Sequence, residues 1–104
     1  MQLKIFIIEQ TQMFKHWLKT LKNPIARVTI ARRIERASFG NFGDHKALSA
    51  GLWEMRIDTG AGYRVYYAQK GECIYLLLNG GDKSSQAKDI EKARTIWTEI
   101  QKHQ

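Results

Sequence analysis

Four side chains that can bind an anion and move a proton alternate along two neighbouring segments of the chain. Glu54 and Arg56 lie two residues apart in the first segment, and Arg64 and Tyr66 lie two residues apart in the second. Residues two apart point to the same face of a β-strand, so two paired strands would bring all four onto one surface. An arginine fork fits two phosphate oxygens, and a carboxylate or phenol can exchange a proton beside it. The pattern predicts a surface that binds and cuts RNA.

Each of these side chains also has a structural interpretation. Arg64 is the first candidate for holding the scissile phosphate, whereas Arg56 could bind phosphate or pair with Glu54 and hold it in place. Glu54 could be a general base, but an ion pair with either arginine would weaken it as a base. Tyr66 could stack on a nucleobase, assist proton transfer or simply pack within the sheet.

Two lysines lie close to these segments in the sequence. Lys46 precedes them, and Lys83 follows the last predicted strand. Neighbouring positive charge makes a lysine easier to deprotonate, so either one could act as an acid or a base near neutral pH. For Lys83, a surface charge leading into the final helix is the alternative. The candidate catalytic residues are therefore Arg64, Lys83, Lys46, Arg56, Tyr66 and Glu54.

The segments that carry the candidate residues have the pattern of a β-hairpin. Residues 59–62, with the sequence TGAG, supply the turn, because glycine tolerates the positive φ that tight hairpins require. Apolar residues occupy the alternate positions on both sides of it: Trp53, Met55, Ile57, Val65 and Tyr67. The hairpin should therefore have one polar face and one apolar face.

The composition indicates one small basic domain, residues 1–104. The formal net charge is +7 and 43% of the residues are hydrophobic, enough for a single core. Such charge is typical of chains that bind phosphates, with a merely soluble basic protein as the alternative. The single Cys73 excludes an internal disulfide and is expected to be a buried thiol. Scattered histidines predict no metal site and no cofactor. Because no apolar run is long enough to span a bilayer, we expect a cytoplasmic protein.

The order of the remaining segments predicts a strand, two helices, four strands and a final helix. Residues 3–8 are apolar on nearly both faces, which favours a central strand. A helix with Phe14 and Trp17 in its core stripe follows. Residues 73–78 predict a strand buried on both faces, and residues 79–86 a break before the final helix. This order indicates an α+β domain with a mostly antiparallel sheet.

The second predicted helix, residues 24–38, has a strongly basic outer face. Asn23 is a good N-cap and Pro24 suits the first helical position. Its apolar stripe is expected to contain Ile25, Val28, Ala31 and Ile34. The arginines outside that stripe are Arg27, Arg32, Arg33 and Arg36. We expect Arg32, Arg33 and Arg36, together with Lys46, to contact RNA phosphates; a solvated helical face is the alternative.

Five motifs, in this order, resemble the RelE/ParE superfamily of toxin–antitoxin toxins, and most closely its HigB-like "addiction module killer" branch. The resemblance covers essentially the whole chain. The motifs are Phe14-x-x-Trp17-Leu18 and residues 40–44 (GNFGD), 52–57 (LWEMRI), 62–67 (GYRVYY) and 76–86 (LLLNGGDKSSQ).

The resemblance implies a RelE-like fold, in which two N-terminal helices pack on a twisted sheet with a C-terminal helix. It implies the toxin of a type II toxin–antitoxin system, a ribosome-dependent and metal-independent mRNA endonuclease that arrests translation and growth. The implied partners are the ribosome and mRNA, a HigA-like antitoxin with a helix-turn-helix, and operator DNA through the antitoxin complex only. No membrane partner is implied.

Two alternatives stay open within the superfamily. ParE-like relatives poison DNA gyrase by binding, and an inactive toxin could be retained as an antitoxin-bound repressor partner. Arg64 matches the family's strand arginine, and Lys46 lies where relatives often have a basic residue. Relatives place a histidine or tyrosine near the C-terminal end for the acid step, where this chain has Lys83 and Gln86. The resemblance therefore leaves the general acid open.

Overall fold

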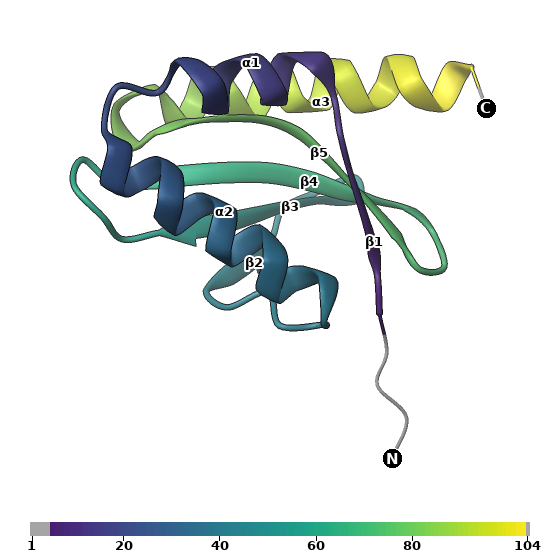
Figure 1. The fold of residues 1–104 in the computed structure, drawn as a ribbon. Coiled ribbons are helices and arrows are strands. Elements are labelled where there is room, and N and C mark those ends of the chain that lie inside the picture. Colours follow the sequence, from purple (N-terminus) through teal and green to yellow (C-terminus); the bar gives the residue numbers. More distant parts are fainter. Residues whose placement is uncertain (1–4, 104) are drawn as a thin grey trace.

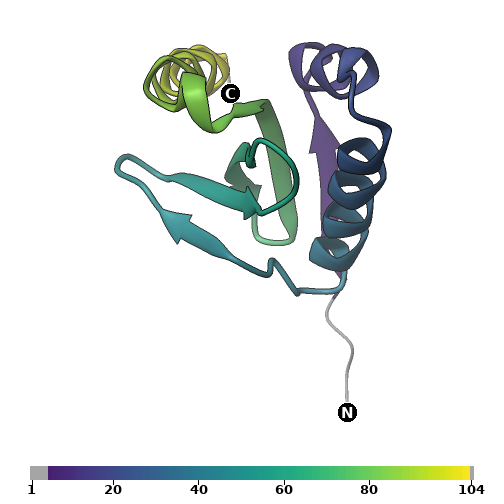
Figure 2. The same cartoon turned by 90° about the vertical axis from the view of Figure 1, so that its left-hand side faces the viewer.

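A curved β-sheet lies between two helices on one face and a third helix on the other (Figures 1 and 2). The structure, a computed structural model, describes residues 5–103. The elements in chain order are β1 (Ile7–Gln10), α1 (Gln12–Thr20), α2 (Pro24–Ser38), β2 (His45–Ala47), β3 (Leu52–Ile57), β4 (Tyr63–Gly71), β5 (Ile74–Asp82), the 3-10 turn η1 (Lys83–Ser85) and α3 (Gln86–Lys102).

The sheet that these residues form has the strand order β1-β5-β4-β3-β2. β1 runs parallel to β5, and every other neighbouring pair is antiparallel. The predicted hairpin is β3 and β4, in which Arg56 lies opposite Arg64 and Glu54 lies opposite Tyr66. The predicted α+β class, its element order and its mostly antiparallel sheet are confirmed.

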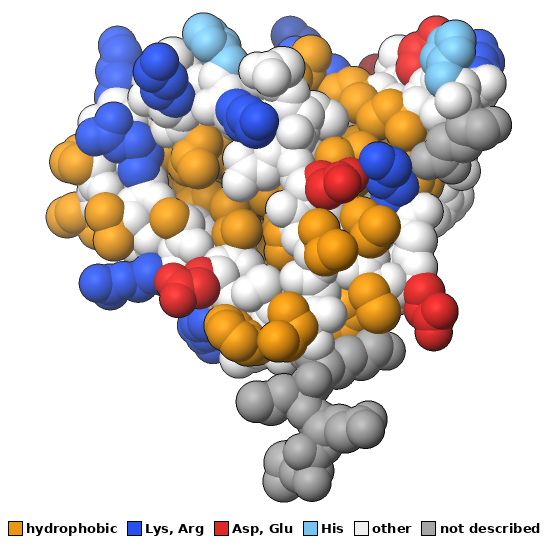
Figure 3. Space-filling model, turned by 45° about the vertical axis from the view of Figure 1, so that its right-hand side comes forward, with side chains coloured by type: hydrophobic (Ala, Val, Ile, Leu, Met, Phe, Trp, Pro, Cys, Tyr) orange, Lys and Arg blue, Asp and Glu red, His pale blue; other side chains and the backbone are white. Residues whose placement is uncertain are grey.

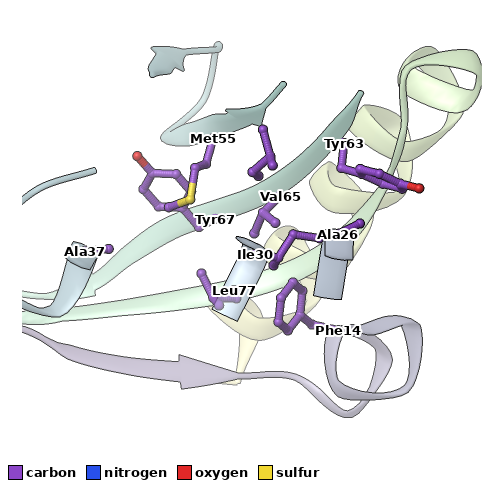
Figure 4. Close-up of a cluster of buried hydrophobic side chains, with 10 residues drawn as sticks. Phe14, Ala26, Ile30, Ala37, Met55, Tyr63, Val65, Tyr67 and Leu77 are labelled. Atoms are coloured by element: carbon purple, nitrogen blue, oxygen red, sulfur yellow. The ribbon is translucent and has the colours of Figure 1, made fainter. Parts of the chain in front are cut away.

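Two separate apolar layers hold the helices on the sheet. On one face α1 and α2 pack on the alternate residues of the hairpin, and Figure 4 shows Phe14, Ile30, Met55 and Val65 in this layer. The other face packs against α3 through a second cluster: Leu52, Tyr66, Ala68, Leu76, Leu78, Ala93 and Trp97. Since Glu54, Arg56 and Arg64 share the face of Tyr66, the polar side of the hairpin lies on the α3 side.

Side-chain caps fix where the first two helices begin. Thr11 Oγ1 accepts a hydrogen bond from the backbone N–H of Phe14 at 3.0 Å, as an N-cap does. Asn23 Oδ1 accepts from the N–H groups of Ile25 and Ala26 at 3.0 and 3.2 Å, and Pro24 takes the first helical position. The predicted bounds of α2 are confirmed. None of the described helices is both long and apolar enough to cross a membrane.

The prediction of a central first strand over residues 3–8 is wrong. β1 covers Ile7–Gln10 and lies at the edge of the sheet, where it pairs with β5 alone. Ile5 and Ile7 are 61% and 56% exposed, because α3 packs mainly on β4 and β5 and leaves this side of β1 open. Residues 3 and 4 lie outside the described residues.

The predicted break at residues 79–86 is also wrong at its start, because β5 continues to Asp82. Two glycines within the strand allow helices to approach closely on opposite faces. A Cβ at Gly80 would overlap the Trp17 ring of α1, and a Cβ at Gly81 would overlap the Asp89 carboxylate of α3. Cys73 lies just before β5 in the turn and is only partly buried, in contrast to the predicted buried thiol.

Three of the four residues of the apolar stripe predicted for α2 face away from the core, whereas Ile34 is partly buried and packs against it. Ile25 and Val28 are 69% and 52% exposed, and Ala31 is exposed as well. The buried residues are Ala26, Ile30 and Ala37. α2 has apolar residues on two sides, and the side with two alanines lies on the sheet because small side chains permit a close approach. Periodicity alone could not distinguish the two sides.

Candidate active site

A pocket of about 360 Å³ lies at the turn end of the hairpin and contains three of the predicted cations. β3 contributes Arg56, β4 contributes Arg64, and η1 contributes Lys83. The backbone N–H of Lys83 donates to the carbonyl of Gly62 at 2.8 Å, which ties η1 to the hairpin turn. The full lining is Asp44, Arg56, Ile57, Asp58, Gly62, Tyr63, Arg64 and Lys83. The sheet and the start of the last helical segment therefore form one concave, charged surface.

Arg64 is held at its inner end and free at its tip. Its side chain is only 15% exposed, and Nε lies 3.5 Å from Glu54 Oε2. The poor alignment of that ion pair is evident because Nε has no hydrogen-bond partner within residues 5–103. Among the described residues, no hydrogen bond is made by the terminal nitrogens of Arg64. These donors are therefore available to an anion in the pocket.

Glu54 is buried under α3 and forms an ion pair with Arg64. Glu54 is 1% exposed, and its Oε2 accepts a hydrogen bond from Gln86 Nε2 at 2.9 Å. It does not line the pocket, and it pairs with Arg64 rather than with Arg56. This burial supports the ion-pair role over the predicted alternative of a general base. The sequence did not reveal that Gln86, in the first turn of α3, fixes the carboxylate.

Arg56, in β3, forms an ion pair with Asp44, the residue before β2. Arg56 Nη2 lies 3.0 Å from Asp44 Oδ1, and the two side chains are 39% and 60% exposed. The backbone N–H of Arg56 also donates to the Asp44 carbonyl at 2.8 Å. Because this pair is solvated, an incoming phosphate can compete with Asp44 for the guanidinium. Asp44 and Asp58 in the lining partly offset the three cations.

Lys83 lies at the rim of the pocket on a capped turn. Asp82 precedes it, and the Asp82 carboxylate accepts hydrogen bonds from the Ser84 hydroxyl at 2.5 Å and the Ser84 N–H at 2.8 Å. Those two bonds hold the pKa of Asp82 below its usual range. Lys83 is exposed, and no ion pair is found for it among the described residues. Its ammonium group can therefore reach a ligand in the pocket.

Tyr66 and Lys46 stand outside this pocket. Tyr66 is fully buried under α3, and no described residue forms a hydrogen bond with its hydroxyl. Burial raises the pKa of Tyr66, and the nearby Glu54 and Asp89 carboxylates raise it further. The predicted base-stacking role for Tyr66 is wrong, because no nucleobase can reach the ring. Lys46 is exposed and lies opposite Glu54 in the register of β2 and β3, beside the pocket rather than within its lining.

Arg33 has a structural role in this part of the molecule. Its guanidinium donates to the carbonyls of Arg56, Phe42 and Asp44 at 2.7, 3.0 and 3.2 Å. Burial lowers the pKa of Arg33, and the neighbouring Arg36 lowers it further. These bonds occupy the donors that we predicted would contact RNA, and they join α2 to β3 and to the loop before β2.

Arg32 and Arg36 do not belong to the pocket either. Both are exposed on α2. α2 packs on one face of the sheet and α3 on the other (Figure 2). In the register of β3 and β4 the pocket arginines share the face of Tyr66, which α3 covers. The structure thus brings together Arg56, Arg64 and Lys83, with Glu54 behind them, and places the predicted α2 contacts on the other side of the sheet.

Comparison with known proteins gives a family, a sequence relative and a structural relative. Residues 16–98 match the family described as "Phage derived protein Gp49-like (DUF891)". A protein of Haemophilus influenzae described only as uncharacterized is 47% identical over 93 residues, covering 89% of this chain and 94% of that protein. A chain from the crystal structure of the toxin–antitoxin complex RelBE2 of Mycobacterium tuberculosis superposes with a TM-score of 0.64 at 19% identity, over 76% of this chain and 99% of that one. This match confirms the predicted RelE-like fold.

Proposed function

We propose a function for this chain, which belongs to the Gp49-like family of phage-derived proteins. Its fold is shared with a chain of a toxin–antitoxin complex. We propose that it is the HigB-like toxin of a type II toxin–antitoxin system and that it cuts mRNA on the ribosome. Its proposed partners are a HigA-like antitoxin with a helix-turn-helix, the ribosome with its mRNA, and operator DNA through the antitoxin complex.

The pocket shared by Arg56, Arg64 and Lys83 is the observation that carries the proposal. Cleavage of RNA by its own 2′-hydroxyl forms a bond from the 2′-oxygen to phosphorus and breaks the bond to the 5′-oxygen. The phosphorus passes through a dianionic, five-coordinate state that cations stabilise more strongly than the starting diester. Arg64 is suited to bind that phosphate, because its tip is free while Glu54 and α3 fix its stem.

The two proton transfers need groups at the pocket rim. One group must take the 2′-hydroxyl proton, and another must give a proton to the departing 5′-oxygen. Lys83 is our candidate acid, since it is exposed at the rim and carries a proton as its ammonium form. Arg56 is proposed to stabilise the phosphate after it displaces Asp44, and Lys46, beside the pocket, to contact the neighbouring RNA backbone. Glu54 is assigned the positioning of Arg64.

Induced expression in bacteria tests this function. We expect growth arrest by the wild-type chain, with primer extension showing mRNA cut within codons. The Arg64→Ala/Lys83→Ala variant should relieve the arrest while its circular dichroism spectrum stays that of the wild type. Arg27→Ala/Lys19→Ala removes the same charges from exposed positions outside the pocket and should leave the arrest unchanged.

Two other results would contradict the proposal. Accumulation of cleaved DNA with intact mRNA would identify the chain as a gyrase inhibitor. Absence of any growth effect from the soluble wild-type chain would support an inactive toxin kept as a repressor partner.

A further inference from the structure

One side of α2 carries a row of large side chains that nothing in the described chain covers. Ile25, Val28 and Phe39, at the end of the helix, are 69%, 52% and 57% exposed. Arg32 and Glu35 lie between them, so the row has steps of three, four, three and four residues. We call these five residues the outer stripe. Steps of this kind place side chains in one line along a helix, which is the pattern of a helix–helix seam.

The outer stripe lies opposite the side of α2 that packs on the sheet. The sheet side is formed by Ala26, Ile30 and Ala37, which are almost fully buried. A surface hollow of about 400 Å³ follows the end of the stripe and is lined by Arg32, Glu35, Arg36 and Phe39. Figure 3 shows apolar side chains reaching the molecular surface in groups beside basic ones. The helix thus has a second apolar side that makes no contribution to the core.

The charges beside this apolar row indicate what it binds. Arg32 and Arg36 are exposed there, and Glu35 is the one carboxylate that lines the hollow with them. α2 is 15 residues long, so it can accept about four turns of another helix. We propose that the outer stripe binds an amphipathic, acidic helix of a partner protein, with aliphatic residues on Ile25, Val28 and Phe39 and carboxylates on Arg32 and Arg36.

RNA and a second copy of this chain fit the outer stripe less well. Ile25 and Val28 are large apolar side chains that make no favourable contact with a phosphate backbone. A second copy would bring another net charge of +7 to the same surface, at a cost in repulsion. An acidic helix satisfies both the apolar row and the arginines.

The inference goes beyond the proposed function and does not depend on it. The outer stripe shares no residue with the lining of the Arg64 pocket, and it lies on the side of α2 that faces away from the sheet. A helix bound to the stripe would therefore leave the pocket open. If the chain is a toxin, its antitoxin is the first candidate to supply the helix.

Two synthetic peptides of about three heptads test the inference. Both carry Leu at the a and d positions; one has Glu at the flanking positions and the other has Lys. Fluorescence anisotropy should show that the acidic peptide binds the full chain at least tenfold more tightly than the basic peptide. Added salt should weaken that binding, and Arg32→Ala/Arg36→Ala should reduce the difference between the peptides.

Variants of the stripe make the test specific. Ile25→Glu/Val28→Glu should weaken binding of the acidic peptide at least tenfold. Ile5→Glu/Met13→Glu places the same charges at apolar residues that are 61% and 45% exposed elsewhere, and it should have no effect. All these positions are exposed, so circular dichroism should show a folded chain in each case. Growth arrest by the Ile25→Glu/Val28→Glu variant should match that of the wild type.

Several results would overturn the inference. It would be overturned if the two peptides bound equally tightly or if neither bound. Equal weakening of acidic-peptide binding by Ile25→Glu/Val28→Glu and by Ile5→Glu/Met13→Glu would also overturn it. Dimerisation in sedimentation that Ile25→Glu/Val28→Glu abolishes, without displacement by the acidic peptide, would assign the stripe to a second copy. Loss of affinity for an RNA oligonucleotide in Arg32→Ala/Arg36→Ala, with peptide binding unchanged, would assign it to RNA. If the wild-type chain causes no growth arrest, the proposed function fails and the peptide result still stands.

Discussion

Replacement of Gly81 by alanine tests whether α3 is packed closely enough on β5 to hold the site together. Gly81 is buried and lies opposite Arg64 in the register of β4 and β5. A Cβ there would overlap Asp89 Oδ2 and lie 2.7 Å from Asp89 Cγ and 3.0 Å from Ser85 Oγ. The side chain of Asp89 must then move, and the hydrogen bond that Ser85 Oγ donates to Asp89 Oδ2 at 2.5 Å is lost.

The expected cost follows from these contacts. Overpacking of a filled site costs about 1–3 kcal/mol, and the lost hydrogen bond adds about 1 kcal/mol. The free energy of unfolding should therefore fall by about 2–4 kcal/mol in Gly81→Ala. With an entropy of unfolding of about 2.1 cal/mol/K per residue, this change lowers the Tm of a chain of this size by roughly 9–18 °C.

Thermal and urea denaturation measure this change, and Gly71→Ala is the matched control. The three atoms nearest to a Cβ at Gly71 belong to the Ile74 side chain and lie at 3.6–3.8 Å, which is ordinary contact, so that variant should stay within about 1 kcal/mol of the wild type. In an Asp89→Ala background, Gly81→Ala should cost much less, because the overlapping carboxylate is gone. The packing argument is refuted if Gly81→Ala is as stable as Gly71→Ala, or if its cost is the same in both backgrounds.

Three further predictions concern polar groups around the site. Tyr66→Phe removes a buried hydroxyl that has no hydrogen-bond partner in the described part of the chain, so stability at pH 7 should not fall. Because the pKa of Tyr66 is raised in the folded chain, stability should fall above about pH 10 as the unfolded chain ionises, and alkaline unfolding by circular dichroism should be less steep in Tyr66→Phe. Arg33→Ala removes a donor from the carbonyls of Arg56, Phe42 and Asp44, of which Asp44 keeps the Arg56 N–H, and should cost about 2–4 kcal/mol in urea unfolding; an unchanged midpoint would contradict the structural role of Arg33. Because the pKa of Asp82 is lowered in the folded chain, its contribution is present above about pH 4 and is lost in stronger acid. Acid unfolding of Asp82→Asn should therefore be less steep than that of the wild type, and equal slopes would count against the cap.

Local patterns in the sequence predicted the hairpin and the start of α2. The alternation around Glu54, Arg56 and Arg64 placed these three side chains on one face, because a strand has a fixed period of two. Asn23 caps α2 as expected, because a side-chain cap depends only on the next three residues. Such signals need no knowledge of the rest of the chain.

Features that depend on distant residues could not be predicted in this way. Which side of α2 packs on the sheet depends on how closely the helix approaches it. Ile25 and Val28 were therefore wrongly predicted to lie in the core. Gly80 and Gly81 were interpreted as a break, although each one makes room for a residue of a helix far along the chain. The bond between Gln86 and Glu54 spans 32 residues, and it decides that the carboxylate positions Arg64.

Cleavage of ribosome-bound mRNA by the purified chain tests the central claim most directly. Ribosomes carrying a defined mRNA would be mixed with the wild-type chain, Arg64→Ala or Arg27→Ala, and the new RNA ends mapped over time. We predict cleavage by the wild type and by Arg27→Ala, and a rate about 100–1000-fold lower for Arg64→Ala, since one donor to the transition-state charge is lost. Cleavage by folded Arg64→Ala at the wild-type rate would contradict the assignment of this pocket as the active site.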